Sequence, residues 1–367
     1  MALILRYVNK SGMVIERFLG IVHVNDTSSQ SLKKAIYSLL LDHSLCTSKI
    51  RGQGYDGASN MQGEINGLKY LILQDTSFAY SIHCFAHQLQ VALVGLSKEN
   101  SDVNNFFYAL TNILNTIGAS FKRRDSLRQH QEDKLEELLK FGEVHAGQVL
   151  QKKDQDIVNA MGLFDLSKKR LQMMREDEWD SMMDELFYAV IDLALQELNN
   201  RFDVVTSDLL FGMASLSPVD SFANFHKDKI MKLAEYYPSE FGDKELRELN
   251  FQLDDFIVYA QKCDSKFLNL KGIKDLAKVM IETKLDQTWS LVYLLVKLTL
   301  IIHVATATVE RAFSSMKYIK NDLCNMMDED LLNGCLVCYI ERSIFKNVSN
   351  DAITDRFQNM KTRRGQL

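Results

Sequence analysis

The sequence changes character near Ser97, and this change limits the folds that the chain can adopt. Before Ser97, β-rich runs alternate with runs of helical periodicity, which is typical of an α/β layer built on a mixed sheet. From Asp102 to about Leu285 one helical pattern follows another, and no run predicts a convincing strand. Proline occurs only at Pro218 and Pro238 among 367 residues, so helix breakers are rare and each predicts a helix boundary. We therefore predict an α/β part followed by a mostly helical remainder.

The first residues predict a β-hairpin and then a helix. Two β-rich runs, Ala2–Val8 and Met13–Val24, flank the turn-forming residues Asn9–Gly12. The polar stretch Asn25–Ser29 supplies a helix cap. The helix expected over Gln30–Ser44 carries an apolar stripe at Leu32, Ile36, Leu39 and Leu40.

A glycine-rich turn follows at Ile50–Gly57, and it holds a single acid, Asp56. Because glycine permits positive φ and close backbone approach, an acid on such a turn can point into an open cleft. The alternative interpretation is an ordinary Asx-type turn. An apolar helix is expected at Leu68–Leu73, a strand at Tyr80–Cys84 and another helix at Phe85–Leu96.

Apolar helices are expected again in the C-terminal third. The run Trp289–Val304 is interrupted by Lys297 and His303 and is too short for a membrane span, so we predict a buried core helix. Ala305–Lys317 predicts a helix with Glu310 in its first turn, where the helix dipole favours an acid. Its apolar stripe comprises Val309, Ala312, Phe313 and Met316. Two further helices and a short basic tail are expected at Leu331–Ile344, Asp351–Lys361 and Lys361–Arg364.

The overall charge excludes a broad attraction to nucleic acid. The net charge is −5, so any DNA contact needs local basic patches. Lys122–Leu139 is densely charged and predicts a solvated amphipathic helix, although its Lys122–Arg124 cluster is a candidate phosphate contact. The six cysteines are scattered without the spacing of a disulfide framework, which favours a reducing compartment. Met1–Tyr7 does not have the pattern of a signal peptide.

Three motifs and the C-terminal sequence resemble hAT-superfamily transposases. The motifs are G-Y-D-G-A-S-N-M at Gly54–Met61, H-C-F-A-H at His83–His87 and A-T-A-T-V-E-R-A-F-S at Ala305–Ser314. The ending R-F-Q-N-M-K-T-R-R-G-Q-L begins at Arg356. The closest resemblance is to a domesticated, plant-type group known as zinc-finger MYM-like or TTF-type zinc-finger proteins with a C-terminal hAT dimerisation region. It covers nearly the whole chain.

This resemblance implies an RNase H-like core interrupted by a large all-helical insertion, in a chain that is mostly helical overall. Residues 1–97 are then the N-terminal part of the core, with its first strand missing. Residues 98–270 are the insertion, in which apparent joins at Phe141–Gln151 and Asp180–Leu186 indicate internal deletions. Residues 271–345 are the dimerisation region that completes the core, and residues 346–367 are a basic tail.

The resemblance also implies a metal site. In that family three acids gather Mg²⁺ or Mn²⁺ for DNA cleavage and strand transfer; Asp56 matches the second acid and Glu310 the third. Oxygen ligands suit such ions. The family's first acid lies on a strand just before the segment that Met1 matches, so we expect this chain to lack it, together with the upstream DNA-binding zinc finger. The other early acids, Asp26 and Asp42, lie outside predicted strands. We therefore expect Asp56 and Glu310 to be vestigial, with weak Mg²⁺ binding and no cofactor.

A zinc site is a further alternative. Cys84 and His87 have the spacing of half a zinc site, and Cys335 and Cys338 could supply the other half. Small buried cysteines are common on apolar helices, however, and we expect Cys84 and His87 to pack near the cleft instead.

The function expected from these residues is dimerisation by a degenerate transposase-derived chain without catalysis. The dimerisation residues are predicted on one side of Leu331–Ile344, at Leu332, Cys335, Leu336, Tyr339 and Ile340. The partner is a second copy or a related hAT protein; DNA binding is expected to be weak, no membrane is involved, and the resemblance implies a nuclear location. Two alternatives stay open, an active metal-dependent DNA transposase or nuclease and a gene fragment without function.

Overall fold

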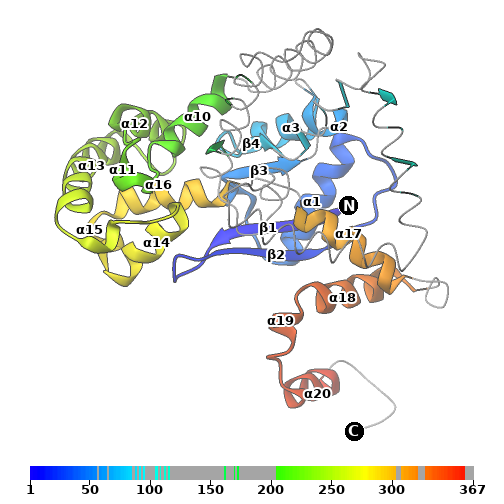
Figure 1. Cartoon of the computed structure of the whole chain (residues 1–367). Helices are drawn as coiled ribbons and strands as arrows, with labels where there is room; N and C mark the ends of the chain where they lie inside the picture. Colours follow the sequence, from blue (N-terminus) through cyan, green and yellow to red (C-terminus); the bar gives the residue numbers. More distant parts are fainter. Residues whose placement is uncertain are drawn as a thin grey trace. The chain divides into compact units, whose positions relative to one another are not determined.

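The computed structural model describes residues 1–55, 58–63, 66–84, 204–302, 307–320 and 327–359, with isolated positions between 87 and 172. These residues are mostly helical, with small sheets near the N-terminus (Figure 1). The chain divides into two compact units. Unit 1 comprises Met1–Tyr7, Ile15–Thr47 and Ala307–Leu367; unit 2 comprises Val8–Val14 and Ser48–Thr306. Among the described helices, none is long and apolar enough to cross a bilayer.

The predicted hairpin is confirmed, with strands β1 (Ala2–Val8) and β2 (Val14–Ile21). Its turn is closed by Asn9, whose backbone N–H donates to the carbonyl of Met13 at 2.9 Å while its side-chain Oδ1 accepts from the Met13 N–H at 2.9 Å. Gly12 adopts a φ of 73°, a conformation that favours glycine. The turn chemistry therefore fixes the hairpin.

Strand β2 contains one more residue than β1 between the turn and the base of the hairpin. Asn9 pairs with Met13 near the turn, whereas Met1 and Val22 exchange backbone hydrogen bonds of 2.6 and 2.8 Å at the base. Nine steps along one strand thus oppose eight along the other, which is the arrangement of a β-bulge. Gly20, with a φ of 158°, lies on the longer strand.

The predicted first helix is confirmed as α1 (Ser29–Asp42), and the expected apolar stripe is its buried face. The cap is Ser28, whose Oγ accepts from the Ser31 N–H at 3.3 Å. Asp26 accepts from the Ser28 N–H and the Ser31 hydroxyl at 2.7 and 2.8 Å. Hydrogen bonding from the Ser28 side chain, then from the Ser31 side chain and the Ser28 backbone, lowers the pKa of its carboxyl. Asp26 therefore serves the helix start. The buried residues are Leu32, Ile36, Leu39 and Leu40.

Two short parallel strands, β3 (Gly52–Tyr55) and β4 (Tyr80–His83), form a second sheet in unit 2. The helices between them are α2 (Ser59–Gln62) and α3 (Leu68–Asp75). The strand predicted at Tyr80–Cys84 and the helix predicted at Leu68–Leu73 are confirmed, whereas Gly52–Tyr55, within the predicted glycine-rich turn, form a strand, and the single mixed sheet is wrong. In the described residues β1 pairs with β2 and β3 with β4, in two separate two-stranded sheets. The alternation of strand and helix patterns in the sequence predicts that a strand exists, but it does not determine which other strand it pairs with.

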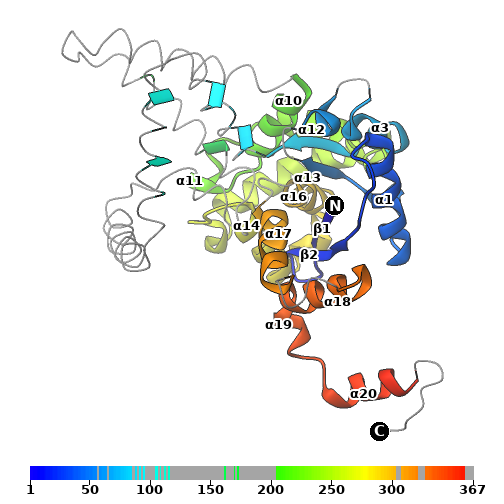
Figure 2. The same cartoon turned by 90° about the vertical axis from the view of Figure 1, so that its right-hand side faces the viewer.

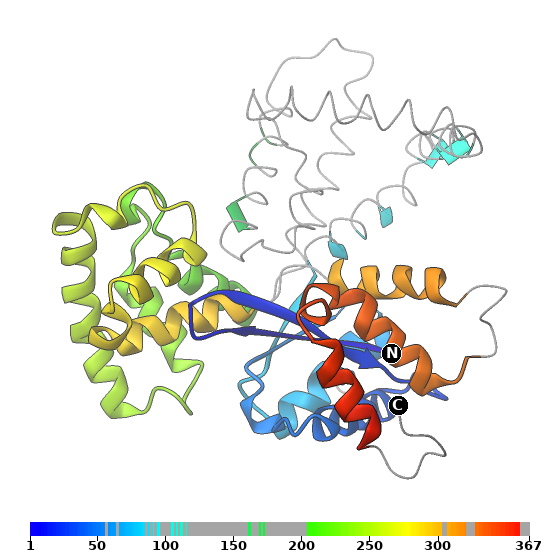
Figure 3. The same ribbon diagram turned by 90° about the horizontal axis from the view of Figure 1, so that it is seen from below.

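The core of unit 2 is a helical bundle whose centre is α16 (Ser290–Ile301), as expected for the longest apolar run (Figures 1 and 3). Leu295, Val296 and Leu300 are fully buried in this bundle. The helices around α16 are α10 (Val204–Ala214), α11 (Val219–Phe222), α12 (Lys227–Glu235), α13 (Asp243–Lys262), α14 (Ile273–Glu282) and α15 (Leu285–Thr288). Pro218 directly precedes α11, and Pro238 lies between α12 and α13, so both predicted boundaries are confirmed.

The β3–β4 sheet is attached to this bundle by two polar contacts within unit 2. The Arg51 guanidinium pairs with Glu240 and lies over the Phe78 ring at 4.4 Å. The Tyr80 hydroxyl donates to the carbonyl of Tyr236 at 2.9 Å, and burial raises the pKa of Tyr80. These contacts hold the strand pair against the helices.

In unit 1 the last helices pack with the hairpin: α17 (Ala307–Ile319), α18 (Glu329–Ile340), α19 (Arg342–Phe345) and α20 (Asn350–Gln358). Figure 2 shows α17 and α18 beside β1 and β2. The core residues here are Phe18, Ala312, Leu332 and Leu336. Segments from the two ends of the chain therefore share one hydrophobic core.

Several predictions stay untested. The boundaries at 97, 270 and 345 describe evolutionary segments, whereas the compact units group the chain differently, with α14 and α16 in unit 2. The predicted helix at Lys122–Leu139 and the predicted joins at Phe141–Gln151 and Asp180–Leu186 lie outside the described residues, as does most of Phe85–Leu96.

Candidate functional site

The first candidate site is the edge of the β3–β4 sheet where both strands end. The strands are parallel, with Tyr55 opposite His83, and the Cys84 N–H donates to the Tyr55 carbonyl at 3.3 Å. The carboxyl ends of parallel strands meet at one edge, where α/β proteins commonly place functional residues. Asp56 follows β3 directly in the sequence, but it lies outside the described residues.

Hydrogen bonds from the Gln53 side chain hold this edge in place. The Gln53 side-chain amide donates to the carbonyls of Lys69 and Ala79 at 3.0 and 2.7 Å, and its Oε1 accepts from the Tyr55 hydroxyl at 2.8 Å. Gln53 thereby connects β3 to α3 and to the residue before β4. At Gly52 a Cβ would lie 3.1 Å from the side chain of Ile302, so only a small residue fits without displacing it.

The motif residues Cys84 and His87 lie at the same end of β4. Cys84 is buried, and His87 is half-buried in a helical turn. Cys335 and Cys338 belong to α18 of unit 1 and are also half-buried. Among the described residues no three His, Cys, Asp or Glu side chains are grouped as a metal site. The zinc alternative stays a prediction.

The other predicted acid, Glu310, lies in the first turn of α17 and is exposed. Near it is a carboxylate that sequence reasoning missed. Glu16 of β2 accepts from Arg6 at 2.9 Å and from the Thr308 hydroxyl at 2.6 Å, so each of its oxygens has a partner. The Arg6 and Glu16 side chains are only 10% exposed. Glu16 therefore fixes the start of α17 to the hairpin.

The Arg6–Glu16 pair could have been found from the sequence. Once the turn pairs Asn9 with Met13, the same register places Arg6 opposite Glu16. Opposite charges directly across a hairpin are a recognisable cross-strand pair. That Asp56 and Glu310 belong to one metal site, as the resemblance implies, stays a prediction.

The predicted dimerisation residues do not share one surface. Leu332 and Leu336 are 6% and 0% exposed, and both pack in the chain's own core with Phe18 and Ala312. We expected Leu332 and Leu336 to face a second copy, but their side chains are buried within this chain. Cys335 and Ile340 are half-buried, and Tyr339 is 46% exposed.

Polar side chains of α18 explain why this face turns inward. The Asn333 Oδ1 accepts from the Ile21 N–H at 3.0 Å, and a Cβ on Gly20 would lie 2.8 Å from that oxygen. Glu341 accepts from the Phe18 N–H at 2.9 Å and from Arg17 at 3.3 Å. The two side chains supply partners to the edge of β2 at its bulge, and sequence reasoning missed both because no local pattern links residues 300 positions apart.

The opposite side of α18 carries a second apolar stripe. It consists of Leu331, Gly334, Cys335 and Cys338, at i, i+3, i+4, i+7 spacing, and Tyr339 flanks it. Leu331 is 55% exposed, and a Cβ on Gly334 would meet nothing within 4 Å. We call these four residues the outer stripe.

Beyond α18 the chain continues as Arg342–Gln358, which we call the C-terminal arm. Neither α19 nor α20 has a buried residue, and Figures 1 and 2 show α20 standing apart from α17 and α18. Five large apolar side chains of the arm are 37–47% exposed: Ile344, Phe345, Val348, Ile353 and Phe357. The outer stripe and the arm thus both expose apolar side chains at the C-terminal end of unit 1.

Comparison with known proteins identifies the N-terminal segment. Residues 1–67 match the family described as ZMYM1/FAM200, RNase-like domain (DUF4371). This domain is derived from hAT-type transposases. The matched residues include the hairpin, α1, β3 and the turn that holds Asp56.

Proposed function

We propose, on the premise that residues 1–67 are a transposase-derived RNase-like domain, that this chain functions by pairing with a second copy of itself. The contact surface is the outer stripe of α18 together with the C-terminal arm. In this proposal the hairpin, the β3–β4 pair and α17 are parts of one RNase H-like fold, and the helices around α16 belong to an insertion. A related hAT-derived chain with the same C-terminal helices is an equivalent partner.

The observation that supports this proposal is the amount of apolar surface left uncovered at the C-terminal end. Half of the large apolar side chains exposed in the described part of the chain lie between Phe313 and Phe357. Scattered exposed apolar residues are ordinary, but a contiguous group of them usually marks an interaction site. Helix α20 has no buried residue, and short isolated helices are marginal in water. A partner chain is the simplest way to cover both the exposed apolar side chains and helix α20.

The outer stripe is suited to a two-fold contact. Gly334 and Cys335 stand at the middle of α18, and their small side chains allow a second helix to approach closely. In a two-fold dimer, residues near the axis meet their own counterparts. Cys335 of one copy therefore lies near Cys335 of the other.

Leu331→Glu should convert the dimer to folded monomers, with a dissociation constant at least about 30-fold higher, because an unpaired charge is placed in an apolar contact. The matched control is Leu41→Glu, at a 75% exposed leucine of α1 in the same unit, which should leave the constant unchanged. Sedimentation over a concentration series measures both. In the unaltered protein, mild oxidation should give a disulfide-linked dimer that Cys335→Ser with Cys338→Ser abolishes. A wild-type chain that is monomeric at micromolar concentration would refute the proposal.

A second candidate function, metal-dependent DNA cleavage, is favoured by one observation. Strand β3 ends directly before Asp56, and Glu310 begins α17, which are the settings that a carboxylate metal site uses. If Asp56 and Glu310 are the only ligands, Mg²⁺ binds weakly and no metal-dependent nicking of DNA is expected. The assay is plasmid nicking with Mg²⁺ or Mn²⁺. If the wild-type chain nicks DNA and both Asp56→Asn and Glu310→Gln abolish the nicking, the main function would be transposase-like catalysis and not dimerisation.

A further inference from the structure

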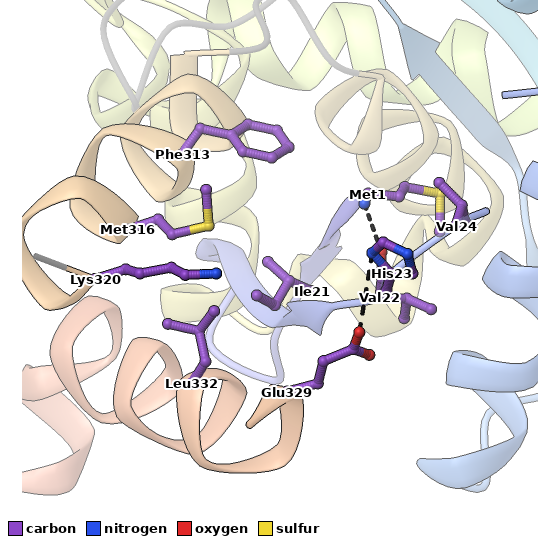
Figure 4. Close-up of a pocket in the computed structure, with 10 residues that line it drawn as sticks. All are labelled: Met1, Ile21, Val22, His23, Val24, Phe313, Met316, Lys320, Glu329 and Leu332. Carbon is purple, nitrogen blue, oxygen red and sulfur yellow. Dashed lines mark hydrogen bonds and ion pairs between the residues drawn. The ribbon is translucent and has the colours of Figure 1, made fainter. Parts of the chain in front are cut away.

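Unit 1 contains a small cavity of ≈ 280 Å³ between the end of β2 and the helices α17 and α18 (Figure 4). Its lining is as polar as it is apolar: apolar side chains stand beside Met1, His23 and two charged side chains. The lining residues include Ile21, Phe313, Met316 and Leu332 inside, with Lys320 and Glu329 at the edge. Ligand pockets usually measure roughly 300–1,000 Å³, so this cavity is suited to one or two side chains rather than a cofactor.

The C-terminal arm offers side chains of the matching kind. Helix α20 is well specified by its sequence, because Ser349 caps it by accepting from the Ala352 N–H at 3.2 Å. Ile353 and Phe357 lie one turn apart on one face, and Arg356 flanks them. Both apolar side chains are exposed, at 42% and 37%. A helix with a defined cap and a partly exposed apolar face can dock against another surface.

The charges at the two ends of α18 determine how a second copy can approach. The start of the helix is acidic, with Asp328, Glu329 and Asp330. After its end, Glu341 is paired with Arg17, and Arg342 and Lys346 add positive charge. Parallel pairing of two α18 helices would place acids against acids. Antiparallel pairing places the acidic start of one helix beside the basic end of the other, and it also opposes the helix dipoles.

Antiparallel pairing brings each arm to its partner's cavity. With the two-fold axis at Gly334–Cys335, the end of one α18 lies beside the start of the other, where Glu329 and Leu332 border the cavity. The arm begins immediately after that end. We infer that each copy inserts Ile353 and Phe357 of α20 into the cavity between β2, α17 and α18 of the other copy. This inference rests on the dimer proposed above and specifies its geometry.

Charged residues at the cavity edge can contact the Phe357 ring and the Arg356 side chain of the inserted helix. Figure 4 shows the Lys320 side chain extending toward the middle of the cavity, where its ammonium group can lie over the Phe357 ring. Glu329 at the opposite edge, whose Oε1 lies 3.8 Å from His23 Nδ1, can also pair with Arg356. Because each copy both gives its arm to the other and receives the other's arm, the assembly is complete with two copies.

Photocrosslinking tests the exchange directly. A benzophenone amino acid replaces Phe357 in an isotopically labelled chain, which is then mixed with unlabelled chain, and the crosslinked peptides are identified by mass spectrometry. We expect crosslinks from labelled position 357 to the unlabelled peptide that contains Phe313 and Met316. The same group at position 351, on the other side of α20, should give few or none.

Crosslinks confined to one copy would show that α20 folds onto its own cavity, and would overturn the exchange. A dimer that persists without crosslinks to the cavity would also overturn the exchange, while leaving dimerisation itself intact. A chain that never dimerises would overturn both.

Charge reversal provides an independent readout. Glu329→Arg and Arg356→Glu should each weaken the dimer about tenfold, and the double variant should recover most of the loss. Two effects that simply add in the double variant would refute the predicted pairing.

Discussion

Leu336→Glu is expected to unfold unit 1 rather than to separate two folded copies. Leu336 is 0% exposed and packs with Phe18, Ala312 and Leu332. A buried carboxylate without a partner costs several kcal/mol, which is comparable with the stability of a whole domain. The variant should therefore lose the hydrogen-exchange protection of β1, β2 and α18.

The matched comparison is Tyr339→Glu on the same helix. Tyr339 is 46% exposed, so this variant should keep unit 1 folded and alter only self-association. Hydrogen exchange and sedimentation, measured together on both variants, separate the two effects. A Leu336→Glu chain with native exchange protection would contradict the position of Leu336 in the core.

The second large effect is expected in unit 2, at Phe256. This side chain is fully buried and makes edge-to-face contacts with Phe222, Phe267 and Trp289, with ring centroids 5.5, 6.2 and 5.6 Å away. Phe256→Ala removes these contacts and leaves a cavity, for which the usual cost is about 3–5 kcal/mol. Denaturant unfolding, followed by the fluorescence of Trp289, measures the loss.

Phe251 on the same helix provides the control. It is 69% exposed, so Phe251→Ala should change the unfolding free energy by less than about 0.5 kcal/mol. Equal losses in the two variants would contradict the orientation of α13.

Local sequence patterns predicted most of the elements. The Asn9–Gly12 turn, the stripe of α1 and the apolar run of α16 are each determined by neighbouring residues, and each was located correctly. Phe313 shows where such patterns stop. It fits the apolar stripe of α17 as well as Ala312 does, yet it is 42% exposed while Ala312 is buried. A stripe that is wider than the available partner surface leaves some of its members in solvent.

The candidate surfaces could be predicted only in part, because α18 has two apolar sides. Leu332 and Leu336 share a side with the anchoring residue Asn333, whereas Leu331 and Cys335 belong to the outer stripe. Periodicity indicates that both sides are apolar but does not show which side meets β2. That choice depends on Asn333 and Glu341 reaching a strand more than 300 residues away in the sequence.

The shared core of the two chain ends has a consequence for synthesis. Leu332 and Leu336, which cover Phe18, are translated more than 300 residues after it. Contacts between such distant residues form slowly, because a very long loop must close first. During that interval the hairpin exposes its apolar face, so a chaperone that binds extended apolar segments should increase the yield of folded protein. A premature stop before residue 330 would leave the earliest part of the chain without its core.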